Sequence, residues 1–216
     1  MTKPDITEMV VVHDVFRDTF SAATDLIAAV SLDDGERTEL LKSFYANIIA
    51  FLTGHHEGED ELIYPLLVDR APEHKDLIQT VNAQHHDIEA LIHSTLGAVE
   101  AWKTGDAASQ AGAASALDGL GERLRIHLGD EEREMLPLCE EHVSVEEWGA
   151  LPGHVLRTYT GDKVWLILGL IRERMTQSQR DAMLQKMPPP AVEMWSGFGE
   201  KAFGELMARV GPPLAS

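Results

Sequence analysis

The chain has 216 residues, of which 18 are basic and 36 are acidic, so its formal net charge is −18 at pH 7. This charge argues against a nucleic-acid partner, because a phosphate backbone requires a basic face, and it disfavours anionic membrane surfaces for the same reason. Hydrophobic residues make up 44% and charged residues 25%, which is ordinary for a soluble globular chain that buries its own core.

No segment predicts a membrane span or a secretion signal. The longest strongly apolar run, Val164 to Ile171, is too short to cross a bilayer, and the first residues lack the apolar core of a signal peptide. The single cysteine, Cys139, excludes an intrachain disulfide and fits a reducing compartment. The sequence therefore predicts a cytoplasmic protein without a membrane partner, and it leaves any protein partner unknown.

Hydrophobic residues recur at helical spacing along the whole chain, and alternating strand patterns are absent. The sequence therefore predicts an all-α protein. Long amphipathic helices are expected from about residue 4 to a turn at 31–35, from 34 to 68, from 73 to 103, and from a small, polar segment after 103 to about 141. Four long helices with short connections predict an up-down-up-down four-helix bundle.

The same spacing predicts which residues of each helix face the interior. In the second helix the inward series is Leu41, Phe44, Ile48, Leu52, His55, Glu59, Leu62 and Leu66. In the fourth helix it is Leu117, Leu120, Leu124, His127, Glu131, Met135 and Leu138. Both series carry a histidine and a glutamate on an otherwise apolar seam.

Residues 144–216 are expected to form shorter helices. Two of these helices begin with capping-box patterns, Ser144 with Glu147 and Thr176 with Gln179. No long flexible linker precedes this region. We therefore expect residues 1–143 to form the bundle and residues 144–216 to be a helical extension packed on it, with a second domain as the less favoured alternative.

An internal repeat relates the two halves of the expected bundle at an offset of 72 residues. The second and fourth helices share the pattern H-x-x-x-E-x-x-x-x-x-P, written HHEGEDELIYP and HLGDEEREMLP. The matched pairs are His13 with His85, His55 with His127, Glu59 with Glu131, and Pro65 with Pro137. Agreement in offset, residue type and helix face indicates a common chemical purpose.

Residues four apart lie on one face of a helix, so each histidine and glutamate of the repeated pattern point the same way. Burying such groups without a partner is costly, and two cations would offset that cost. Imidazole and carboxylate ligands suit iron, manganese or zinc better than calcium or magnesium, and no thiolate supports a structural zinc site. The expected ligands are His13, His55, Glu59, His85, His127 and Glu131.

These segments, with VVHDVFR and QHHDIEALI, resemble hemerythrin-like proteins of the HHE cation-binding family over roughly residues 5 to 142. The resemblance implies a non-haem di-iron centre in a four-helix bundle, in which Glu59 and Glu131 bridge two iron ions that an oxo or hydroxo ligand also joins. Histidines would cap the ions, and an incompletely coordinated iron would bind O2, NO or peroxide. Manganese and zinc are the alternative metals.

The chain departs from the oxygen-carrying hemerythrins, which use five histidines with two of them four apart on the third helix. Here the corresponding positions hold Val81 and Glu89. The candidates for a fifth histidine ligand are His56, which has apolar neighbours, and His86, which lies beside Asn82 in a polar environment. We rank His56 ahead of His86.

Three classes of function fit the sequence. The first is a di-iron protein that binds O2, NO or peroxide for sensing, storage or stress response. The second is an enzyme in which the same centre decomposes peroxide or reacts with NO. The third is a metal-free helical interaction module. No catalytic residue stands out, because glycine-rich phosphate loops, H-E-x-x-H and serine-nucleophile motifs are absent, and so is the E-x-x-H pattern of ferritin-like proteins.

Overall fold

The computed structural model describes residues 3–211, and every regular element in that range is a helix. The expectation of an all-α protein is therefore confirmed. Within the same range, no helix combines the length and the apolar content that crossing a membrane requires. The ends of the expected bundle and extension, residues 1–2 and 212–216, lie outside the described residues.

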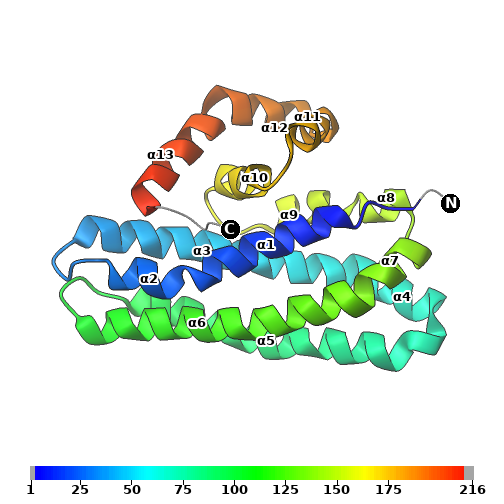
Figure 1. Ribbon diagram of the computed structural model, residues 1–216, viewed down its shortest axis with the longest axis horizontal. Helices are drawn as coiled ribbons and strands as arrows, with labels where there is room; N and C mark the ends of the chain where they lie inside the picture. Colours follow the sequence, from blue (N-terminus) through cyan, green and yellow to red (C-terminus); the bar gives the residue numbers. More distant parts are fainter. Residues whose placement is uncertain (1–2, 212–216) are drawn as a thin grey trace.

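The elements up to residue 142 form four long helical segments. These segments lie side by side (Figure 1). The first two consist of α1 (Thr7–Ser21) with α2 (Ala23–Ala28), and of α3 (Gly35–Gly58), η1 (Glu59–Ile63) and α4 (Tyr64–Arg70). The other two consist of η2 (Pro72–His74) with α5 (Lys75–Ala101), and of α6 (Ala107–Asp130), η3 (Glu131–Met135) and α7 (Leu136–His142). The side chains of Asp34 and Asp106 accept hydrogen bonds from backbone N–H groups at the starts of α3 and α6, which explains where these helices begin.

The second and fourth segments each widen into a π-helical turn, η1 and η3, at the same offset as the sequence repeat. Each turn precedes a proline, Pro65 or Pro137, that has no N–H to donate and whose ring would clash with the carbonyl four residues earlier in a regular α-helix. A π turn relieves this conflict and is frequent at functional sites.

The π turn η1 corrects one part of the expected inward series. Leu62 and Leu66 are only partly buried, whereas Ile63, Tyr64 and Leu67 are buried. The wider turn holds an extra residue, so the face that points inward moves forward by one position after Glu59. Helical spacing alone assumes a constant 3.6 residues per turn and cannot anticipate this shift.

The region after residue 143 consists of α8 (Val145–Trp148), α9 (Leu151–Thr158), α10 (Val164–Glu173), α11 (Gln177–Lys186), α12 (Pro189–Met194), η4 (Trp195–Gly199) and α13 (Glu200–Val210). Both expected capping boxes are confirmed, at Ser144 with Glu147 and at Thr176 with Gln179. Helix α9 packs on α3, and α10 packs on α1 and α3, so this region lies along one side of the long segments (Figure 1).

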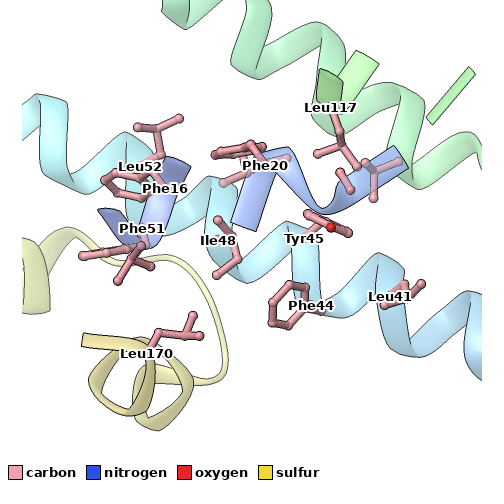
Figure 2. Close-up of a cluster of buried hydrophobic side chains, with 14 of the residues drawn as sticks. Phe16, Phe20, Leu41, Phe44, Tyr45, Ile48, Phe51, Leu52, Leu117 and Leu170 are labelled. Carbon is pink, nitrogen blue, oxygen red and sulfur yellow. The ribbon is translucent and has the colours of Figure 1, made fainter. Parts of the chain in front are cut away.

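One large apolar cluster joins the long segments to the later helices. Figure 2 shows its aromatic centre, where Phe16 and Phe51 meet with ring centroids 4.9 Å apart. Leu170 of α10 points toward α3 in the same view and belongs to the same cluster. An ion pair between Asp18 of α1 and Arg174, the residue that follows α10, adds a polar contact at 2.6 Å.

A second, smaller apolar cluster lies toward the other end of the long segments. It includes Met9, Ile63, Val81 and Met135, one residue from each segment. Each of the four residues precedes or follows a polar residue of the repeated pattern by a single helical turn. The polar groups therefore lie between two apolar clusters, and solvent does not reach them along the axis of the segments.

Candidate metal centre

The structure brings the side chains of all seven sequence-predicted site residues together between the four long segments. Each is at most 6% exposed. They are His13 on α1, His55 and His56 on α3, Glu59 at the start of η1, His85 on α5, His127 on α6, and Glu131 at the start of η3. In contrast, the side chain of His86 is 82% exposed and lies outside this group.

The donor atoms of these residues form two groups, each able to hold one cation. One donor atom from each of His13, His55, Glu59 and Glu131 lies within 4.8 Å of the other three. One ring nitrogen from each of His56, His85 and His127 forms a second group by the same measure. The rings of His56 and His85 stack, with centroids 4.2 Å apart.

Glu59 reaches both groups of donors. Its Oε1 lies 3.4 Å from His55 Nε2, and its Oε2 lies 3.8 Å from His85 Nε2. The two oxygens of this carboxylate therefore face opposite groups, which is the placement that a bridging ligand requires.

Glu131 also lies between the two groups, through a single oxygen. Its Oε2 is 3.5 Å from His13 Nε2 and 3.7 Å from His127 Nε2. Its other oxygen, Oε1, accepts a hydrogen bond of 2.7 Å from the hydroxyl of Tyr64. Both glutamates thus connect the two histidine groups, but they do so in different ways.

Three of the histidines are oriented by hydrogen bonds from their outer ring nitrogens. The Nδ1 atoms donate at 2.7–2.9 Å, which turns each Nε2 toward the interior. The pairs are His13 with Glu132, His85 with Asp60, and His127 with Gln84. Such outer contacts fix the ring and its tautomer in metal sites, and they increase the basicity of the inner nitrogen.

Sequence reasoning missed these outer residues, although one signal was present. Asp60 and Glu132 directly follow the two repeated glutamates and are themselves 72 residues apart. Asp60 contacts His85 and Glu132 contacts His13, so each carboxylate reaches a histidine in the other half of the repeat. A carboxylate at the same place in both copies of the repeat therefore marks the outer shell of the site.

Tyr64 is a further residue that sequence reasoning missed. It is 3% exposed, donates to Glu131 and lies 3.5 Å from His85 Nε2 through its hydroxyl oxygen. Burial and the negative charges of Glu131 and Glu59 raise the pKa of Tyr64 well above its ordinary value, so the hydroxyl keeps its proton. The available signal was an asymmetry, since Leu136 occupies the equivalent position of the other copy.

Burial determines the protonation of three of the clustered histidines. It lowers the pKa of His55 and His56 well below the ordinary value, with further lowering by neighbouring imidazoles. Burial also lowers the pKa of His127, to about 4. These rings are therefore neutral at pH 7, which is the form that coordinates a metal.

The two glutamates differ in charge. Burial, followed by repulsion from Glu131, raises the pKa of Glu59 well above its ordinary value. Burial opposes ionisation of Glu131 as well, but attraction to the surrounding histidines lowers the pKa of Glu131 to about 2. Two cations between the carboxylates would let both ionise, because they replace the repulsion with attraction.

Unpartnered donor atoms provide the test of whether a metal pair fits. Six buried atoms of the site have no hydrogen-bond partner: His13 Nε2, His55 Nε2, His56 Nε2, Glu59 Oε1, Glu59 Oε2 and Glu131 Oε2. Each unsatisfied buried polar atom costs about 1–3 kcal/mol. All six are nitrogen or oxygen donors of the kinds that iron, manganese and zinc accept, so the residues fit such ions.

The remaining histidines contribute nothing to either group. His74 and His93 are exposed, and His142 is partly buried. His154 of α9 is 4% exposed and packs near Gly58, and its Nδ1 lies 3.8 Å from Glu61. It faces the outer side of η1 and is not among the clustered donors.

Removing the carboxylate of Asp60 is expected to weaken metal binding about 10- to 100-fold, because the His85 ring loses the contact that orients it. The Asp60→Ala variant measures this when metal-free protein is titrated with ferrous iron. Glu57→Ala is the matched control, since Glu57 is an exposed carboxylate three residues earlier. Equal affinity in the two variants would contradict an outer-shell role for Asp60.

Comparison with known proteins agrees with this geometry. The family model described as the hemerythrin HHE cation binding domain matches residues 5–139, which is more than half of the chain and includes all seven clustered residues. Searches of curated proteins and of solved structures found no match. The chain therefore belongs to the hemerythrin HHE cation-binding family, and the clustered histidines and glutamates are its candidate cation site.

Proposed function

We propose that the chain holds two iron ions between Glu59 and Glu131 and uses them to bind O2, NO or peroxide. One ion would be held by His13 and His55, and the other by His56, His85 and His127, with both carboxylates shared. The observation that carries this proposal is the set of six unpartnered donor atoms in a buried interior. Manganese or zinc would fit the same donors.

A pair of iron ions, when bound, supplies redox chemistry with O2, NO or peroxide, because iron changes oxidation state readily. The residues of the chain orient the donors and exclude bulk water. Phe16 lies against His55, with ring centroids 5.3 Å apart, and keeps that side of the centre apolar. Tyr64 holds Glu131 through a hydrogen bond and retains its proton next to the site.

A metal-free interaction module is a weaker proposal for the same residues. Without cations, the six unpartnered atoms would remain unsatisfied at a cost of about 1–3 kcal/mol each. Elemental analysis of protein produced with iron present tests the difference. About two iron ions per chain are expected; a content near zero, or zinc alone without a redox-sensitive spectrum, would contradict the di-iron proposal.

Binding and turnover are separated by adding O2, NO or peroxide to the reduced protein. Binding predicts a stable charge-transfer band in the near-ultraviolet and visible range without consumption of the ligand. An enzyme, which is the second proposal, predicts steady O2 evolution from peroxide or continuous loss of NO. Binding is our first proposal and turnover the second.

We also propose an up-down-up-down four-helix bundle for residues 1–143 and a packed extension for residues 144–216. The short connections between successive long segments support the bundle. The apolar cluster shared between the long segments and α10 supports an extension rather than a second domain. A reducing cytoplasm is the proposed location, since Cys139 is a buried free thiol.

A further inference from the structure

A surface pocket of about 540 Å³ lies beside the candidate centre, between η1 with α4 on one side and α5 on the other. Its lining includes Asp60, Tyr64, Ile78, Asn82, Ala83 and His86. A water molecule in the liquid takes about 30 Å³, so a divalent cation with its hydration shell fits inside. Most of the exposed lining is apolar, and the carboxylate, amide and imidazole groups within it are ligands for such a cation.

Two side chains of the pocket also contact the candidate centre. Asp60 accepts from His85 Nδ1 at 2.7 Å, and its side chain is 40% exposed. Tyr64 is buried and donates to Glu131 at 2.7 Å. Asp60 and Tyr64 thus each contact both the pocket and a residue of the site. Asn82 Nδ2 donates to Asp60 Oδ1 at 3.2 Å and completes this wall.

Three other directions from the centre are closed by packed apolar side chains or by a paired charge. The ring of Phe16 lies next to His55. It also packs on Phe51 within the large apolar cluster (Figure 2). On the outer side of His13, the Glu132 carboxylate also binds Arg17 at 2.8 Å. The smaller apolar cluster closes the remaining end. A hydrated cation would lose its water without replacement along the two apolar directions, which is unfavourable. At Glu132 the positive charge of Arg17 opposes the approach of a cation.

We propose that this pocket is the entrance through which a divalent cation reaches the centre, with Tyr64 as its inner wall. The proposal rests on the proposed di-iron function. The cation exchanges water for the oxygen and nitrogen atoms at the rim before it reaches the buried donors. Movement of the Tyr64 ring then opens the last layer, because its side chain separates the pocket from Glu131.

Blocking the pocket tests this entrance. Ala83 is exposed on α5 and lines the pocket, so Ala83→Trp places a large ring in it with no change to a donor. Uptake of ferrous iron by metal-free protein, and removal of iron from loaded protein by a chelator, are expected to slow about tenfold or more, which corresponds to a higher barrier for passage. The final iron content is expected to equal that of the wild type.

Ala90→Trp is the matched control, since Ala90 is an exposed alanine on the same helix outside the pocket lining. It is expected to take up and release iron at the wild-type rates. Gln79→Trp, one turn before Ala83 on the pocket side, is a second blocking variant if Ala83→Trp loses helix content by circular dichroism. Wild-type rates in a folded blocking variant would overturn the entrance.

Two substitutions test the wall itself. Tyr64→Ala removes the ring and the hydroxyl, whereas Tyr64→Phe removes only the hydroxyl. Chelator removal of iron is expected to be faster in Tyr64→Ala than in Tyr64→Phe, and equal rates would overturn the wall role. If the wild-type protein takes up no iron, the di-iron function and the entrance are both overturned. If all variants take up and release two iron ions at equal rates, only the entrance is overturned.

Discussion

The Glu131→Ala variant is expected to retain at most one of the two iron ions. In the structure, Glu131 Oε2 lies within 3.7 Å of both His13 and His127, which belong to different donor groups. Removing this carboxylate takes an oxygen from both groups and leaves the Tyr64 hydroxyl without its acceptor. Iron content by elemental analysis, together with the optical spectrum of the oxidised protein, measures the loss.

Three comparisons make this result specific. Glu59→Ala is expected to lose metal as well, because Glu59 faces both groups through its two oxygens. Glu131→Gln keeps the size of the side chain but not its charge, so it separates charge from packing. His93→Ala, at an exposed position on α5, is expected to leave the iron content unchanged. Full iron occupancy in Glu131→Ala would contradict the bridging role.

The stability of the variant without metal is a further part of the same prediction. Metal binding is linked to folding, so a ligand at about 1,000 times its dissociation constant adds about 4 kcal/mol to the free energy of unfolding. Glu131→Ala is therefore expected to lower the melting temperature of iron-loaded protein more than that of metal-free protein. The difference between the two shifts reports lost metal binding rather than lost packing.

The metal-free protein is expected to lose stability as the pH falls from about 6.5 to about 4. Burial lowers the pKa of His127 to about 4, and it lowers the pKa values of His55 and His56 well below the ordinary value of 6.5. Between the folded and unfolded pKa values, the unfolded chain binds more protons. The free energy of unfolding therefore rises with pH in this window and falls on acidification.

The size of this effect follows from one of the three groups. For His127 alone, the free energy of unfolding is expected to fall by about 3 kcal/mol when the pH drops from above the unfolded pKa to below the folded pKa. The raised pKa of Glu59 acts in the opposite direction, because the folded state then holds a proton that the unfolded state releases above its ordinary carboxyl pKa. Three histidines outweigh one carboxyl, so the net dependence keeps its sign.

Urea unfolding of chelator-treated protein at pH 7.5, 6, 5 and 4, followed by circular dichroism, measures this dependence. His56→Leu is a matched variant, because Leu128 occupies the equivalent position of the other repeat and is fully buried. It removes one of the groups that must stay neutral, so a weaker dependence on pH is expected. Constant stability between pH 7.5 and 5 would contradict the prediction.

The two halves of the repeat differ at three positions near the donor atoms. His56, Tyr64 and Gln84 differ from their equivalents at the offset of 72, which are Leu128, Leu136 and Val12. All three contact the donor group of His85 and His127: His56 stacks on His85, Tyr64 approaches it, and Gln84 accepts from His127. The two groups of donor atoms therefore have different surroundings, although they come from a repeated sequence.

The sequence by itself determined the all-α class, the internal repeat and the types of donor residue. These follow from local spacing, since residues four apart share one helix face whatever the rest of the chain does. The same reasoning placed His55 with Glu59 and His127 with Glu131 on buried seams, and the burial of these side chains agrees. Their role as metal ligands stays a proposal.

Only the tertiary structure decided which residues of neighbouring segments meet. The choice between His56 and His86 depends on how α3 and α5 are rotated about their axes, and helical spacing within either one does not specify that rotation. The π turn at η1 brings Tyr64 inward by adding a residue to one turn, and the contacts of Asp60 and Glu132 cross between halves of the repeat. These features arise from packing between distant segments. Steric fit and hydrogen bonds between those segments select one arrangement, and the spacing of residues within a single helix specifies neither.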